Sequence, residues 1–68
     1  MNHALLHNII QVVAVESDKP AESITAESKL EDLGMDSLDF VALMIALEIP
    51  EAKWQGVVTV ADILRVME

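Results

Sequence analysis

The sequence predicts an all-α fold, a small bundle of three main helices and one short helix in a single domain covering residues 1–68. Apolar residues recur with helical spacing in three separate segments, and no segment shows the strict alternation of a half-buried strand. The hydrophobic share of 53% is well above that of a disordered chain. A length of 68 residues leaves room for only one small core.

The first helix is expected from about His3 to Val15. Pro20 follows soon afterwards, and it cannot continue a helix and also restricts the residue before it. The apolar residues at positions i, i+3, i+4 and i+7 form one face of this helix; they are Leu6, Ile9, Ile10 and Val13.

The segment from Ala21 to Met35 has no sustained hydrophobic period. Ile24, Leu30 and Leu33 stand alone among polar residues. We therefore expect a long ordered loop that these three side chains attach to the core. A loop of this length is unusual in a small domain unless it has a function.

The second helix is expected from about Ser37 to Glu48, and Pro50 limits its end. Asp36 is placed to cap it by accepting backbone N–H groups of the first turn. Asp39 adds negative charge near the positive end of the helix dipole. The sequence therefore predicts a well-defined start for this helix.

A short helix and a longer one complete the predicted fold. The short helix runs from about Glu51 to Gln55, carries Trp54 and stops at Gly56. The last helix begins near Thr59, where Thr59 and Asp62 fit a capping box with Asp in place of Glu. Its apolar face consists of Val60, Ile63, Leu64 and Met67.

The charge balance narrows the classes of partner. The chain has 12 acidic and 4 basic residues, a formal net charge of -8. The phosphates of nucleic acids and anionic membrane surfaces would repel such a chain. Partners with basic patches are favoured, because opposite charge speeds association. Plain solubility is the alternative explanation of the acidic balance.

Other features of the chain point to a soluble, cytoplasmic protein, expected to be a monomer. There are no cysteines, so neither a disulfide nor a thiolate metal site is expected. The first residues lack the positive start of a targeting segment. The longest apolar run, Phe40 to Leu47, is far shorter than the roughly 18 residues of a membrane span.

Ser37 is the residue with the clearest chemical potential. It directly follows the acidic cap Asp36, at the exposed end of the predicted loop. A phosphate ester there would face unpaired backbone N–H groups and the positive end of the helix dipole, worth about 0.3–1 kcal/mol. The position suits a phosphorylated or phosphodiester-modified serine. The alternative is an ordinary polar residue in the first turn.

The stretch from Asp32 to Asp39 resembles the modification motif of acyl carrier proteins, whose core is Asp36-Ser37-Leu38 here. The similarity continues through Ile49-Pro50-Glu51 and through Thr59-Val60-Ala61-Asp62, so that it covers nearly the whole chain. The resemblance implies an acyl-carrier-like bundle in which Ser37, flanked by Asp36 and Leu38, receives 4'-phosphopantetheine from coenzyme A.

The resemblance also implies the mode of action. A separate phosphopantetheinyl transferase would attach the arm, whose thiol would carry acyl groups as thioesters. The protein would be no enzyme. It would shelter its cargo between the helices and deliver it to enzymes of fatty acid, polyketide or related acyl metabolism.

The second helix has two apolar sides when its residues are spaced by about 100°. One side should face the core and any acyl pocket. With two residues from later segments, the expected acyl-pocket set is Phe40, Leu43, Met44, Leu47, Ile49 and Ile63. The other side, with its acidic rim, is the expected partner surface. That set is Asp36, Leu38, Asp39, Val41, Ala42, Ile45 and Glu48. The alternative is that this side is also buried.

Two features depart from the common family pattern, and the size of one side chain is a further observation. Ala42 stands where many relatives carry a glutamate, which puts the usual fatty acid synthesis partners in doubt. The chain runs almost directly from Leu47 to Ile49 and Pro50, where relatives usually have several more residues. Phe40 is bulky for a position facing the pocket. We therefore expect a smaller cavity and a carrier of short or unusual acyl groups.

The sequence disfavours some other sites and functions and leaves others open. No metal site is expected, because His3 and His7 lack a third ligand nearby. A hydrolase would need a histidine and an acid beside Ser37, and the only histidines lie near the N-terminus. Asp32, Asp36 and Asp39 do not match a calcium loop, although loose divalent-ion binding stays open. A peptidyl or D-alanyl carrier is a close variant, and an unmodified helical adaptor is the alternative from a different class.

Overall fold

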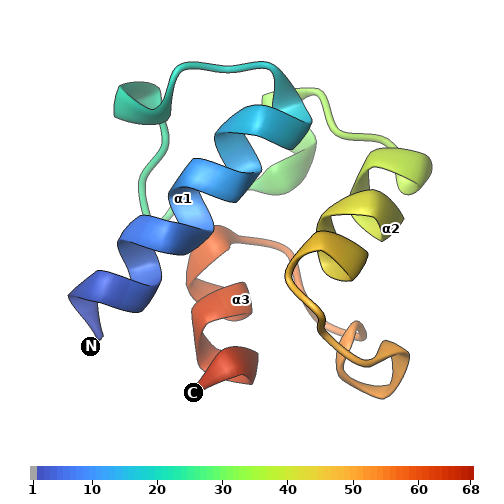
Figure 1. Cartoon of the computed structure of the whole chain (residues 1–68). Helices are drawn as coiled ribbons and strands as arrows, with labels where there is room; N and C mark the ends of the chain where they lie inside the picture. Colours follow the sequence, from blue (N-terminus) through green and yellow to red (C-terminus); the bar gives the residue numbers. More distant parts are fainter. Residues whose placement is uncertain (1) are drawn as a thin grey trace.

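The computed structural model describes residues 2–68, so Met1 of the predicted domain lies outside the described residues. Between Asn2 and Glu68 the only β-type pairing is an isolated antiparallel bridge between Lys29 and Thr59, and the all-α prediction is confirmed. Within the described residues, three α-helices and three short 3-10 helices follow one another (Figure 1). They are α1 (His3–Ser17), η1 (Ala21–Ser23), η2 (Leu30–Leu33), α2 (Ser37–Ala46), η3 (Glu51–Lys53) and α3 (Val60–Met67).

Helix α1 is slightly longer than predicted. It starts where the Asn2 side chain accepts a hydrogen bond from the Leu5 N–H, at 3.0 Å. It continues past Val15 to Ser17, because a left-handed Asp18 (φ 59°) ends it before Pro20 is reached. The predicted apolar face is turned inward, and two of its residues, Ile9 and Val13, are fully buried.

The segment from Ala21 to Met35 contains more structure than the sequence predicts, namely the two 3-10 helices η1 and η2. Local i to i+3 hydrogen bonds form such turns without a hydrophobic period, so periodicity could not indicate them. Ile24 and Leu30 are buried as expected, and Leu33 is half-buried. Backbone bonds tie this segment to the start of α3: Leu30 N–H to Val58 O, Val60 N–H to Ser28 O and Ala61 N–H to Ala26 O.

Helix α2 and η3 are both shorter than predicted. Helix α2 ends at Ala46, two residues before Glu48, because Glu48 takes a left-handed conformation (φ 57°) that closes the helix. Ile49 N–H then bonds back to Met44 O at 3.0 Å, and the chain passes through Pro50 directly into η3. The short helix ends at Lys53 rather than Gln55.

One core holds the described residues together. Helix α1 packs against both α2 and α3, while α2 and α3 are joined through η3 and the loop after it (Figure 1). The two ends of the described chain also meet, since Asn2 N–H donates to a Glu68 side-chain oxygen at 3.3 Å. Buried side chains from all three α-helices and the long loop form the core: Ile9, Val13, Ile24, Leu30, Met35, Leu43, Met44, Ile49, Val60, Ile63 and Leu64.

None of the helices between Asn2 and Glu68 is both long and apolar enough to cross a membrane.

Candidate functional site at the start of α2

A capping box defines the first turn of α2. Asp39 N–H donates to Asp36 Oδ1 at 2.9 Å, which confirms the predicted cap. Asp36 N–H donates in return to Asp39 Oδ2 at 3.3 Å, a contact that the sequence analysis did not predict. Both carboxylates therefore point towards the backbone and hold the turn in place.

Ser37 is the first residue of α2, and its side chain is exposed. Within residues 2–68, no hydrogen-bond acceptor is found for the backbone N–H groups of Ser37 and Leu38. Unpaired N–H groups at a helix start attract an anion. The residues present therefore fit a phosphodiester on Ser37 Oγ, because these donors can offset repulsion from the neighbouring carboxylates.

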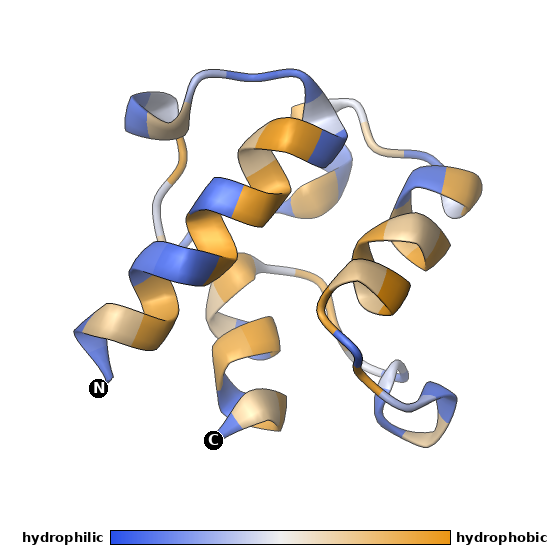
Figure 2. Cartoon of the chain, viewed as in Figure 1, coloured by the Kyte–Doolittle hydropathy of each residue, from blue (hydrophilic) through white to orange (hydrophobic). Residues whose placement is uncertain are grey.

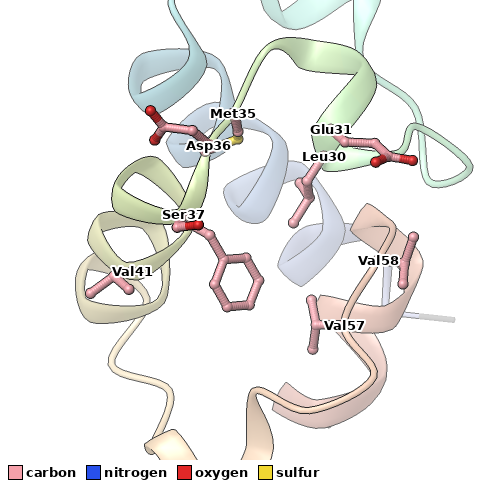
Figure 3. A pocket seen from close by; sticks show the side chains of 9 residues that line it. Leu30, Glu31, Met35, Asp36, Ser37, Val41, Val57 and Val58 are labelled. Atoms are coloured by element: carbon pink, nitrogen blue, oxygen red, sulfur yellow. The ribbon is translucent and has the colours of Figure 1, made fainter.

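A pocket with a volume of about 540 Å³ opens beside Ser37. This is within the range of small-molecule sites, roughly 300–1,000 Å³. Figure 3 shows Ser37 and Val41 of α2 on one side of it, with Val57 and Val58 facing them from the segment before α3. The lining is mostly apolar and consists of Leu30, Glu31, Met35, Asp36, Ser37, Phe40, Val41, Val57 and Val58.

The predicted acyl-pocket residues occupy three places in the structure. Only Phe40 lines the pocket beside Ser37. Leu47 and Ile49 line a second hollow of about 210 Å³ at the other end of α2. The remaining three side chains, Leu43, Met44 and Ile63, are fully buried in the core. Helical spacing groups residues on one side of α2, but it does not separate those beside Ser37 from those one or two turns further on.

Five pocket residues were not predicted as site residues, because they lie outside α2 and its cap, where helical spacing gives no information. They are Leu30, Glu31, Met35, Val57 and Val58. The adjacent valines, just before the Thr59 capping box, could have been a signal, since apolar residues preceding a cap often pack on neighbouring structure. Met35 carries the same signal, since it directly precedes the Asp36 cap, whereas nothing comparable marks Glu31.

The predicted partner surface lies largely in the open. Leu38 is 80% exposed and Ile45 is 65% exposed, and Ala42 lies exposed between them. Figure 2 shows that α2 is hydrophobic along most of its length. Asp36 and Glu48 are exposed at its two ends, and Asp39 is half-exposed. Val41 differs from the rest, because it is half-buried and lines the pocket.

Comparison with known proteins bears directly on this site. A family model described as a phosphopantetheine attachment site matches residues 7–48, which include the whole start of α2. An acyl carrier protein from Saccharopolyspora erythraea is 42% identical over 67 residues, covering 88% of this chain and 70% of the relative. The chain belongs to the acyl carrier protein family.

Further acyl carrier proteins match along nearly their whole length. The one from Wolinella succinogenes is 39% identical over 72 residues, covering 96% of this chain and 95% of the relative. The one from Helicobacter pylori (strain G27) is 36% identical over 72 residues, covering 96% and 92%. The cofactor of this carrier family is phosphopantetheine, in agreement with the sequence prediction.

Proposed function

We propose that the protein carries acyl groups as thioesters on a 4'-phosphopantetheine arm attached to Ser37 Oγ. It delivers them to enzymes of fatty acid, polyketide or related acyl metabolism, acting as a cytoplasmic monomer, and it catalyses no reaction itself. The observation that carries the proposal is the position of Ser37. This side chain is exposed at the first residue of a capped helix and lines an apolar pocket.

Attachment requires an accessible hydroxyl, and the exposure of Ser37 supports this requirement. Transfer from coenzyme A joins Ser37 Oγ to the phosphorus that bears the pantetheine. It breaks the phosphoanhydride bond to the leaving group, 3',5'-ADP, and passes the hydroxyl proton to a base on the transferase. The bound arm supplies the thiol that forms thioesters.

The residues around Ser37 prepare this position without taking part in bond formation. The capping box of Asp36 and Asp39 holds the first turn in one conformation, so the transferase meets a defined backbone. The N–H groups of Ser37 and Leu38, for which residues 2–68 provide no acceptor, are available to a phosphodiester at the helix start. A mostly apolar pocket next to the attachment point removes part of an acyl chain from water.

The partners that fit the exposed side of α2 are enzymes with a basic rim around an apolar patch, the transferase among them. Leu38, Ala42 and Ile45 supply the apolar contact. Asp36, Asp39 and Glu48 border it with negative charge. In a chain with a net charge of -8, this arrangement favours fast, salt-dependent association over a large permanent interface.

Intact mass spectrometry after incubation with acetyl-coenzyme A and a broad-specificity phosphopantetheinyl transferase tests the proposal. We expect a gain of one acetyl-phosphopantetheine, from which hydroxylamine removes only the acetyl group, as expected of a thioester. Ser37→Ala should gain nothing. Ser23→Ala is the matched control, because Ser23 is also an exposed serine in a short helical turn. No gain by folded wild type would favour the unmodified adaptor instead.

A further inference from the structure

Two aromatic rings meet at the inner side of the pocket. Phe40, which lines the pocket, packs edge to face against Trp54, with ring centroids 6.0 Å apart and an interplanar angle of 89°. Both side chains are half-buried and pack against the core. Phe40 therefore packs against the only tryptophan of the chain, which is not among the residues that line the pocket.

Trp54 is itself held in place by two contacts. Its indole Nε1–H donates to Ile49 O at 2.8 Å. Its own carbonyl accepts the Val57 N–H at 3.3 Å, in the turn that leads to the opposite wall of the pocket at Val57 and Val58. Trp54 thus contacts the Phe40 ring on one wall of the pocket and, through its carbonyl, the backbone of Val57 on the other wall.

The space behind Phe40 is filled. The next inward-facing residues of α2, Leu43 and Met44, have no exposed surface, and neither has Ile63 of α3. An acyl chain that enters the pocket from the arm on Ser37 and runs inward along α2 therefore reaches Phe40 and then a closely packed core. Going further would require displacing Phe40 and creating space among fully buried side chains, which packed cores resist.

We propose that Phe40, positioned by Trp54, is a stop that limits the length of acyl chain the pocket can shelter. This inference rests on the proposed function, since it needs an acyl group carried on a phosphopantetheine arm at Ser37. Chains short enough to end at Phe40 gain protection from water, and any additional methylene groups stay in solvent. The short connection after α2 contributes to this arrangement, because Ile49, three residues after the helix ends, accepts the hydrogen bond of the indole that packs against Phe40.

The test is a series of straight-chain acyl forms, from acetyl to dodecanoyl, prepared with the transferase from the corresponding acyl-coenzyme A. Mass spectrometry confirms loading before any other measurement. Thermal unfolding, followed by circular dichroism, then gives the Tm of each form. Each sheltered methylene should raise the Tm by up to about 3–6 °C. In the wild type we expect the rise to stop before dodecanoyl.

Fluorescence of Trp54 reports on the same end of the pocket without any substitution. Its emission should change with chain length up to the point where the Tm levels off, and then stay constant. Phe40→Leu removes the ring but keeps an apolar side chain. In this variant the Tm should keep rising to longer acyl chains than in the wild type. Trp54→Leu should likewise extend the rise in Tm to longer acyl chains. Val58→Ala is the matched control, because it shortens a pocket side chain that is 48% exposed. Its Tm should stop rising at the same acyl-chain length as in the wild type.

The outcomes distinguish failure of this inference from failure of the proposed function on which it rests. Absence of any mass gain overturns the proposed function and this inference with it. Successful loading with a Tm and a tryptophan emission that keep changing up to dodecanoyl in the wild type overturns the stop alone. The stop is also overturned if the Tm of Phe40→Leu and the Tm of Val58→Ala stop rising at the same acyl-chain length.

Discussion

Helices α2 and α3 start with the same local motif and use it differently. Each has a capping box, formed by Asp36 and Asp39 in α2 and by Thr59 and Asp62 in α3. The first residue inside α2 is the exposed Ser37, whereas the first residue inside α3 is Val60, which is fully buried. The motif fixes where a helix begins, and the residue that follows it determines whether that start faces solvent or the core.

Hydrogen bonding at the two caps differs as well. The Asp62 carboxylate accepts the Thr59 N–H at 3.0 Å, the Val58 N–H at 2.9 Å and Arg65 Nη1 at 2.9 Å. The backbone bond from Thr59, followed by that from Val58, lowers the pKa of Asp62 from 3.8 to about 2. Asp36 and Asp39 each accept one backbone N–H. The α3 cap binds the backbone of the loop before it, and the α2 cap leaves the Ser37 side chain exposed.

Changing the residue after each cap should give the largest contrast. Val60→Ser removes a fully buried apolar side chain and places a hydroxyl in the core, so it should destabilise the protein by about 2–4 kcal/mol. Ser37→Ala, at the corresponding exposed position, should change stability by less than about 0.5 kcal/mol. Urea unfolding of both variants measures the contrast, and similar losses would contradict it.

Removing the carboxylate of the α3 cap should have the next largest effect. Asp62→Asn should cost about 1–2 kcal/mol at neutral pH, since two backbone N–H groups lose a charged acceptor. Because the pKa is lowered on folding, this stabilisation is complete above 3.8 and is lost as the pH falls through about 2. The difference between wild type and Asp62→Asn in urea unfolding should therefore shrink on acidification, and a constant difference would count against this assignment.

The α2 cap should matter less for stability. Asp36→Ala should cost about 0.5–1 kcal/mol, because the cap is exposed and water can replace the lost acceptor. Asp36→Ser can still cap and should recover most of this loss, with thermal unfolding as the measurement. A loss as large as that of Asp62→Asn would remove the distinction between the two caps.

The smallest effect is expected at the outer edge of the α3 cap. Arg65 donates to Asp62 at 2.9 Å, but its side chain is 73% exposed. Arg65→Gln should cost about 0.2–0.5 kcal/mol, and the loss should fade as salt screens the pair. Thermal unfolding at low and high salt measures it. A loss that is independent of salt would point to packing of the side chain instead.

Helix starts were the most predictable part of the fold. Asp36 and Thr59 were both identified as caps from the sequence, because capping depends on residues within one turn. Helix ends were less predictable. Asp18 and Glu48 close α1 and α2 with left-handed backbones, although neither is the glycine usually found there.

The candidate site also contains a part that the sequence predicts and a part that it does not. Ser37 and its flanking residues are contiguous, so their relation is visible in the sequence. The pocket is not, because Leu30, Val57 and Val58 reach it from other segments, where backbone bonds across the loop bring them together. The pairing of Phe40 with Trp54 likewise depends on how the short connection after α2 folds back.

The most direct test of the account is the position of the arm in the modified wild-type protein, mapped by tandem mass spectrometry of its peptides. We predict phosphopantetheine on Ser37 and on no other residue, in particular not on the other serines, Ser17, Ser23 and Ser28. An arm on any of these, or none at all on folded protein beside a working control carrier, would contradict it.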